Sequence, residues 1–430
     1  MGSDPFMKLE IRGARIIDPA SNRDKAGSIF VADGKIAALD KAPTGFKADE
    51  TIDAQGLTAI PGIVDLSARL REPGFEYKAT LESEMRAAAA GGVTTLACPP
   101  DTDPPLDEPG LVEMLTRRAA GLQHGRVHPL GALTVGLKGE RLAEMALLAG
   151  AGCRGFSQGN AALPETATLL NAFKYAATFG FTVWLRPQDA NLSAGGVAHE
   201  GEVATRLGLA PIPVVAETIA VRTILELMAA TGARVHLARI SSAAGVRLVA
   251  EAKSRGAALT CDVGVHHLHL CDRDIGDFNA NCNFVPPLRD PSDRDALRRA
   301  AAEGVVDAVC SDHTPVDEDA KQVPFGEAEP GATALELLLP LTLQWGKEAG
   351  LKPADALGSI THRPARILGV PAGTLALGAA ADICLFDPAR PWIVDAAALA
   401  SQGKNTPFQG LELVGRVART LVAGRTVYAA

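Results

Sequence analysis

Short stretches of alternating hydrophobic and polar residues mark the two ends of the chain. Residues 8–59 contain runs such as IRGARII and SIFVADGKIAALD, in which apolar residues recur between Gly, Asp and Pro turns. A period of two is typical of strands with one buried face. After residue 371 the pattern returns in GTLALGAAADICLFDP and RVARTLVAGRTVY. We therefore expect residues 7–59 and 371–430 to form one small composite β-sandwich domain.

The segment between these ends, residues 60–370, follows a different pattern. Apolar, strand-like stretches alternate with Ala- and Leu-rich helical ones; the strand-like stretches include GGVTTLACPP, FTVWLRP, ARVHLARISS, AALTCDVGV and VVDAVCSDH. So many β-then-α units favour an α/β fold of the (β/α)8 TIM-type barrel class, and a doubly wound parallel sheet is the alternative. Residues 1–6 (MGSDPF) precede a second methionine at position 7, so we interpret them as a cloning remnant outside both domains.

Composition narrows the class of protein. A chain of 430 residues with 47% hydrophobic content can bury a large core. The net charge of −8, without any Lys/Arg run, argues against binding of nucleic acid or of an acidic membrane surface. No apolar run approaches the roughly 20 residues that span a bilayer. Seven scattered cysteines without C-x-x-C spacing fit a reducing compartment, so we expect a cytoplasmic protein.

Several motifs at the expected strand ends carry a family resemblance. They are PGIVDL (61–66), LREPG (70–74), AAAAGGVTTL (87–96), HEG (199–201), VPPLRD (285–290), SDHTP (311–315) and GAAADICLFDP (378–388). In order and spacing they resemble the signature segments of the dihydroorotase family, in the amidohydrolase superfamily, across nearly the whole chain. The resemblance implies an enzyme that hydrolyses a cyclic amide by means of a divalent metal held at the mouth of its barrel.

The first metal-binding motif of that family is altered in this chain. Active members read D-L-H-x-H-L-R, in which both histidines bind metal and the arginine holds the substrate carboxylate. Here the segment is Asp65-Leu66-Ser67-Ala68-Arg69-Leu70-Arg71, so Ser67 and Arg69 stand at the ligand positions and Arg71 is kept. A guanidinium has no acceptor lone pair and stays protonated, so Arg69 cannot bind a cation.

The remaining ligand positions that the resemblance assigns are also changed. The bridging carboxylate is replaced by Gln158 in FSQGN, and two further histidines are replaced by Arg186 and Arg239. Only the aspartate of the SDHTP segment, Asp312, persists. Because one carboxylate does not make a catalytic metal site, we predict no intact metal centre and no cofactor. Three arginines at one centre would replace the charge of the ions, with Asp312 and Asp101 as candidate partners.

The positions that contact substrate in the family differ as well. The resemblance places Asp101 at a family asparagine, Val285 at a second asparagine and Val316 at a histidine. The carboxylate of Asp101 would repel an anionic substrate, and neither valine side chain can form a hydrogen bond with the ring of a cyclic amide. Arg71 and Asp312 are therefore vestigial candidates, either for substrate binding and general-base chemistry or for plain ion pairing.

Two further segments leave alternatives open. One is a relocated metal site in the cluster Cys261, Asp262, His266, His267, His269 and Cys271. Strand alternation places Cys261, His267 and His269 on one face and Asp262 and His266 on the other, so that no three clearly converge. The other is loop 314–331, which corresponds to a substrate-contacting segment of the family or is a plain surface loop.

The pattern of losses most closely resembles the non-catalytic dihydroorotase homologues of certain bacteria. That resemblance implies a structural subunit of pyrimidine biosynthesis, a pseudoenzyme that assembles with aspartate carbamoyltransferase in an oligomer. One alternative is an active cyclic amidohydrolase with a remodelled or single-metal site, which would need zinc. Another is an anion-binding module built on the arginine cluster.

Overall fold

The computed structural model describes residues 7–430; the expected cloning remnant, residues 1–6, lies outside the described residues. Two sheets together supply the eight parallel strands of the barrel. β8 and β9 count as one barrel strand, because they are successive parts of the same stretch of chain. The strands are β6 (Ile63–Asp65), β7 (Val93–Cys98), β8 (Arg126–Pro129) with β9 (Gly131–Ala132), β10 (Phe156–Ser157), β11 (Thr182–Leu185), β14 (Arg234–Leu237), β15 (Leu259–Gly264) and β16 (Ala308–Cys310). The (β/α)8 prediction is confirmed.

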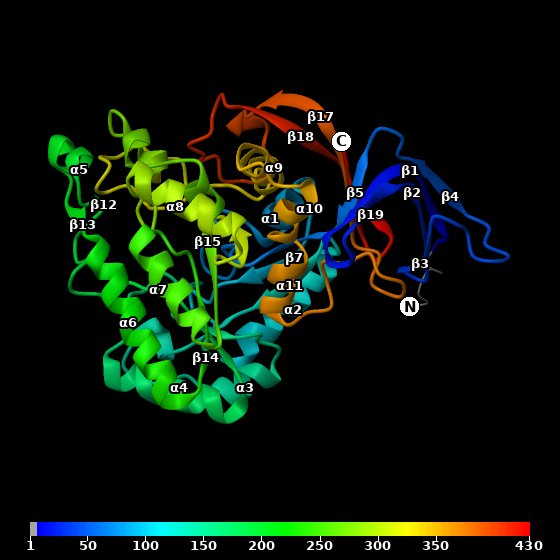
Figure 1. Cartoon of the computed structure of the whole chain (residues 1–430). Coiled ribbons are helices and arrows are strands. Elements are labelled where there is room, and N and C mark those ends of the chain that lie inside the picture. Colours follow the sequence, from blue (N-terminus) through cyan, green and yellow to red (C-terminus); the bar gives the residue numbers. More distant parts are fainter. Residues whose placement is uncertain (1–6) are drawn as a thin grey trace.

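Helices surround this barrel (Figure 1). They are α1 (Leu81–Ala90), α2 (Pro109–Leu122), α3 (Met145–Gly150), α4 (Thr166–Phe179), α6 (Val214–Thr231), α7 (Ala243–Ser254), α8 (Pro291–Ala302), α9 (Leu338–Glu348), α10 (Pro353–Gly358) and α11 (His362–Leu368). The short β12 (Ala198–His199), α5 (Glu202–Leu207) and β13 (Pro211–Ile212) form an excursion between β11 and α6. No helix in residues 7–430 is long and apolar enough to cross a membrane.

The barrel closes between its first and last strands. Beyond β6 and β16, the Arg69 N–H donates to the His313 carbonyl (2.9 Å), and the His313 N–H donates to the Ser67 carbonyl (3.1 Å). A doubly wound sheet would leave these two strands at opposite edges, so this closure excludes that alternative. It also brings the segments that follow β6 and β16 together at the mouth.

The chain ends form one eight-stranded sheet beside the barrel (Figure 1). Its strands are β1 (Leu9–Asp18), β2 (Arg23–Ala32), β3 (Lys35–Leu39), β4 (Glu50–Asp53), β5 (Thr58–Pro61), β17 (Ile383–Ile393), β18 (Glu412–Val422) and β19 (Arg425–Ala429). Successive parts of β1 pair with β4 and then with β5, so the sheet folds over a core of its own. The central pairing of β5 with β17 joins the two chain ends.

The boundary between the two units differs from the predicted one in two places. β5 extends the small-domain sheet to Pro61, and the first barrel strand begins only at Ile63. In addition, the connection between β17 and β18 returns to the barrel. There Ser401 Oγ donates to Glu84 Oε2 (2.7 Å), and Asn405 Nδ2 donates to the Thr314 carbonyl (3.0 Å). Part of residues 371–430 therefore supports the barrel mouth.

Glu84 of α1 links these parts of the molecule. Its carboxylate is fully buried and lies 2.6 Å from Nε2 of His313, whose Nδ1 accepts a hydrogen bond from the Ala334 N–H. This assigns the proton to Nε2, which donates to Glu84. The same carboxylate also accepts from Ser401 Oγ and the Gln402 N–H. Burial raises the pKa of Glu84, but the bond to His313 and the other donors outweigh burial and hold this pKa below its ordinary value.

We expect Glu84→Gln to lower the free energy of unfolding by about 2–4 kcal/mol, because an amide cannot accept from all of these donors. Glu82→Gln is the matched control, since Glu82 forms an exposed i,i+4 pair with Arg86 on the same helix. That change should cost under about 0.5 kcal/mol. Urea unfolding followed by circular dichroism measures both, and equal effects would contradict a supporting role for Glu84.

Candidate functional site

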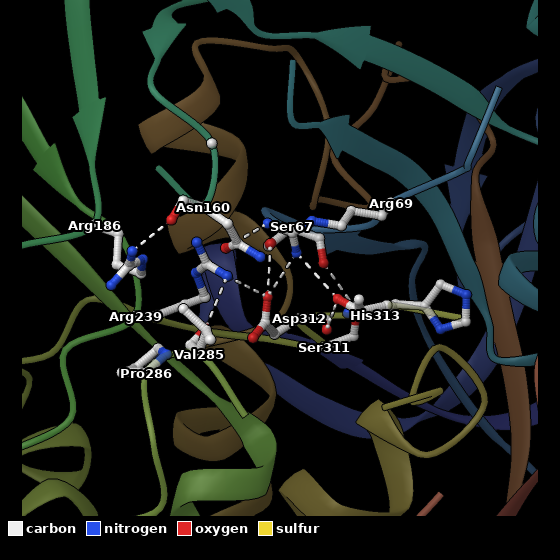
Figure 2. A network of polar contacts seen from close by, with 12 residues as sticks. Ser67, Arg69, Asn160, Arg186, Arg239, Val285, Pro286, Ser311, Asp312 and His313 are labelled. Carbon is white, nitrogen blue, oxygen red and sulfur yellow. Dashed lines mark hydrogen bonds and ion pairs between the residues drawn. The ribbon is translucent and has the colours of Figure 1, made fainter. Parts of the chain in front are cut away.

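A cluster of charged side chains fills the C-terminal mouth of the barrel (Figure 2). Ser67 and Arg69 follow β6, Arg239 follows β14 and Asp312 follows β16. Asp312 Oδ1 accepts from Arg239 Nη1 at 2.9 Å, from Arg69 Nη1 at 3.1 Å and from Ser67 Oγ at 3.3 Å. All four residues are buried. The predicted pairing of Asp312 with arginines at the former ligand positions is confirmed for Arg69 and Arg239.

The next contacts divide the arginines into paired and unpaired ones. Arg69 Nε donates to Asp101 Oδ2 (3.0 Å), and its Nη2 donates to Asn160 Oδ1 (2.9 Å). Arg186, which follows β11, donates only to neutral oxygens: from Nη2 to the Asn160 carbonyl (2.5 Å) and from Nη1 to Gln188 Oε1. Within residues 7–430 it has no carboxylate partner. Neither candidate partner, Asp312 or Asp101, therefore forms an ion pair with Arg186.

Two buried carboxylates inside the barrel hold the backbone that presents this cluster. Asp65, at the end of β6, accepts from the Ser311 N–H (2.9 Å) and from Ser311 Oγ. Asp262 of β15 accepts from the Arg239 N–H (2.6 Å). Arg239 and Asp312 both adopt positive φ, at 61° and 46°, a conformation that L side chains rarely adopt. Such strain costs about 1–3 kcal/mol per residue and persists only where surrounding contacts impose it.

The charges of the cluster depend on one another. Burial raises the pKa of Asp312, but Arg239 and Arg69 outweigh burial and hold it below its ordinary value. Burial lowers the pKa of Arg186 to about 9, and the neighbouring guanidiniums of Arg239 and Arg69 contribute to this shift. At neutral pH the carboxylate is therefore ionised, and Arg186 still carries its charge.

This donor set does not fit the divalent metal that the fold family implies. Zinc and related ions bind imidazole, thiolate or carboxylate. At the mouth, the ligand positions present the hydroxyl of Ser67, three guanidiniums and the single carboxylate of Asp312, whose Oδ1 already accepts three hydrogen bonds. Fixed positive charges occupy the positions of ligands, so they would repel a cation rather than bind it.

The other residues that the sequence singled out lie around this centre but do not all enter it. Gln158 turns aside, since its Nε2 donates to the Leu137 carbonyl (2.8 Å) and it also contacts Thr134. Asn160, two residues later, is the residue of this segment that contacts Arg69 and Arg186. Sequence reasoning missed it because the family pattern directed attention to the lost carboxylate. Asp101 is the ion-pair partner of Arg69, which confirms its prediction as a candidate partner of the arginines.

The three remaining substrate positions have structural contacts. The Val285 carbonyl accepts from Arg239 Nη1 (3.3 Å), and the buried Val316 donates its N–H to Asn405 Oδ1 (3.1 Å). Arg71 donates from Nε to the Pro315 carbonyl (2.7 Å), and it forms no ion pair with a carboxylate in the described chain. Burial, with a contribution from Arg69, lowers its pKa to about 10. The suggestion that Arg71 is an ion-pair residue is therefore wrong.

Loop 314–331 is tied to the barrel at both ends by one side chain. Asn405 Nδ2 donates to the carbonyls of Thr314 and Gly331, each at 3.0 Å. Near its end, Glu329 pairs with Lys78, whose Nζ lies 2.5 Å from Oε2. The loop is thus fixed against the segment that follows β6 and is more than a plain surface connection.

The cysteine and histidine cluster at 261–271 does not form a metal site. β15 ends at Gly264, and Val265–Leu268 is a 3-10 turn, so the strand alternation that we expected to continue through His269 is wrong. Two of its histidines contact backbone carbonyls: His267 Nε2 lies 3.2 Å from that of Pro286, and His269 Nε2 lies 3.0 Å from that of Leu341. The ring of His266 packs against Phe284, and neither of its nitrogens has a hydrogen-bond partner within residues 7–430. All seven cysteines are buried and free of disulfides.

Among residues 7–430, the one group of three side chains able to bind a metal consists of His199, Asp290 and Asp293, none of which belongs to the charged cluster. Its carboxylates have structural roles: Asp290 Oδ1 caps α8 by accepting from the Asp293 N–H (2.9 Å), and Asp293 Oδ1 accepts from the Ala243 N–H (2.7 Å). Arg289 lies 3.4 Å from Nδ1 of His199. We regard the group as a polar support for α7 and α8.

Comparisons with known proteins agree with this architecture. The family model "Dihydro-orotase-like" matches residues 56–244, and that of the "Amidohydrolase family" matches residues 202–427. The chain is 46% identical to the dihydroorotase-like protein of Pseudomonas aeruginosa, over 98% of this chain and 100% of that protein. It is 39% identical to a dihydroorotase of a Geobacter species, over 99% and 100% of the two chains.

Solved structures support the same fold. The L-hydantoinase (dihydropyrimidinase) of Arthrobacter aurescens superposes with a TM-score of 0.88 at 24% identity, covering 98% of this chain and 96% of that one. A D-hydantoinase (dihydropyrimidinase) from a Thermus species gives a TM-score of 0.82 at 20% identity, covering 98% and 96%. The barrel and the composite sheet agree with this likeness, and the sequence identity of 39–46% extends over nearly the whole chain. The chain therefore belongs to the dihydroorotase-like family of the amidohydrolases.

Proposed function

We propose that this protein is a non-catalytic dihydroorotase homologue that acts as a structural partner of aspartate carbamoyltransferase in pyrimidine biosynthesis. The observation that supports loss of catalysis is the replacement of metal ligands by guanidiniums that are fixed in hydrogen bonds. In metal-dependent hydrolases the bound ion lowers the pKa of its water from 15.7 to about 7. General-base assistance alone contributes only about 10²–10⁴-fold, too little to replace that effect. The partner is inferred from the family resemblance.

In this proposal Asp312 is a structural counter-ion. We expect Asp312→Asn to lower the free energy of unfolding by about 3–5 kcal/mol, because two buried guanidiniums would lose their shared carboxylate. Asp24→Asn is the matched control, since Asp24 forms a half-exposed pair with Arg15 and should cost under about 1 kcal/mol. Chemical unfolding measures both. An unchanged or increased stability of Asp312→Asn would show that Asp312 is not needed to neutralise the arginines.

Metal content and hydrolase activity test the loss of catalysis directly. We expect purified protein, incubated with zinc and desalted, to retain well under one zinc per chain at the mouth, as measured by mass spectrometry of the metal. We also expect no interconversion of carbamoyl aspartate and dihydroorotate above a no-protein control. Turnover that a chelator abolishes and zinc restores would support the alternative, an active cyclic amidohydrolase with a remodelled site.

The partnership has an independent test. We expect this protein and the aspartate carbamoyltransferase of the same organism to elute together in size-exclusion chromatography, at a mass that requires both chains. Transcarbamoylase activity should fall when this chain is left out and return when it is added back. Separate elution with full activity of the transcarbamoylase alone would contradict the structural role, whatever the hydrolase assay shows.

A further inference from the structure

The barrel mouth contains more positive than negative charge. Four buried guanidiniums lie there, those of Arg69, Arg71, Arg186 and Arg239, each at most 8% exposed. The carboxylates that form ion pairs at this centre are those of Asp312 and Asp101. Both are already engaged, Asp101 with Arg69 and Asp312 with Arg69 and Arg239. Buried charge without a partner is costly, so the surplus predicts a compensating negative group.

Two of these arginines keep N–H groups unused. Nε of Arg186 and Nε of Arg239 are buried and have no hydrogen-bond acceptor anywhere in residues 7–430. The Arg239 contacts with Asp312 and Val285 use only Nη1. Its Nε and Nη2 edge therefore stays free, the same edge through which Arg15 holds both oxygens of Asp24. Arg186 and Arg239 follow adjacent barrel strands, because β11 pairs in parallel with β14 up to Leu185 and Leu237.

Space for a ligand exists beside this free edge. A cavity of about 20 Å³ lies between the strand ends and is lined by Ser67, Ser157, Gly159, Trp184 and Arg239, with apolar residues beside them. Arg239 is the guanidinium that lines it, and Arg186 does not reach its wall. A volume of about 10–15 Å³ is enough for one water-sized particle. The cavity therefore accommodates a single small ion, and a phosphate or a dicarboxylate would require its walls to move. The two carboxylates of the centre also disfavour an anion of higher charge.

We propose that the mouth of the barrel binds one small monovalent anion of halide size, held by the free Nε and Nη2 edge of Arg239 and attracted by the unpaired charge of Arg186 on the adjacent strand end. The site takes the place of the cation site that the family fold implies, with the sign of the bound charge reversed. It does not depend on the proposed partnership, because it rests on side chains within this chain alone. Chloride is the cellular ion of the required size and charge.

Thermal unfolding tests the proposal in solution. Chloride should raise the Tm of the whole protein in a saturable way, whereas gluconate, which is too large for the cavity, should not, both at one fixed ionic strength. A ligand at 100 times its Kd adds about 2.7 kcal/mol, which for a chain of this size corresponds to roughly 3–5 °C. Equal Tm values in chloride and gluconate across the titration would overturn the proposal.

Arg186→Met identifies the site. Because Arg186 has no carboxylate partner in the described chain, removing its charge should leave Tm in gluconate unchanged or higher and should abolish the rise with chloride. Arg222→Met is the matched control, since Arg222 is an exposed arginine of α6, and this variant should keep the chloride response. A chloride response that survives in Arg186→Met would place the ion elsewhere and overturn the assignment.

Crystals of the unmodified protein grown in sodium bromide provide a second measurement that depends on no variant. We expect an anomalous peak within about 3.5 Å of Nε of Arg239, replaced by water when crystals are grown in gluconate. A water at that position in both salts would overturn the proposal, and so would a zinc-edge anomalous peak there.

Discussion

The shared carboxylate of Asp312 is the interaction on which the barrel mouth depends. It follows the last barrel strand and binds Arg69, which follows the first strand, and Arg239, which follows β14. One buried side chain thus joins three strand ends that are far apart in sequence. Since guanidiniums are tolerated in an interior only where acceptors meet them, Asp312 makes the arginine substitutions compatible with the fold.

The scaffold beneath this cluster is separate from its chemistry. Asp65 and Asp262 hold the backbone of the strand ends through N–H groups, and Glu84 holds His313 beside the closure of the barrel. These contacts involve backbone or neighbouring polar groups and do not require that the mouth hold a cation. A site on a rigid barrel can therefore exchange its ligands for residues of another kind while the surrounding architecture stays intact.

The exchange has a definite chemical consequence. An imidazole or carboxylate offers lone pairs to a cation, whereas a guanidinium offers only N–H donors and a fixed positive charge. The mouth can neutralise carboxylates and accept anions, but its arginines cannot assemble a metal-bound nucleophile. The carboxylates of the mouth do not neutralise every arginine. Arg186 donates hydrogen bonds to Asn160 and Gln188, but these neutral acceptors leave its positive charge uncompensated.

Local patterns along the chain were enough to predict the barrel, the composite sheet and the identity of the substituted positions. Strand-length apolar runs and ordered motifs are local signals, and Ser67, Arg69, Arg239 and Asp312 follow strands that must end at one face. The hydrogen-bond partners of these side chains, by contrast, follow from the three-dimensional packing. Asn160 rather than Gln158 meets the arginines, Asp101 joins Arg69, and His267 and His269 leave the strand pattern at Gly264.

These outcomes depend on loop conformation and side-chain direction, which no periodic pattern encodes. At residues with positive φ, such as Arg239 and Asp312, the backbone leaves the extended conformation, so the alternation of side chains along the strand does not predict their direction. The return of residues 401–405 to the barrel likewise depends on contacts between residues that lie 317 and 91 positions apart in the chain. The sequence therefore predicts which charged residues lie at the mouth, whereas the packing of loops and side chains sets which ion pairs and hydrogen bonds they form.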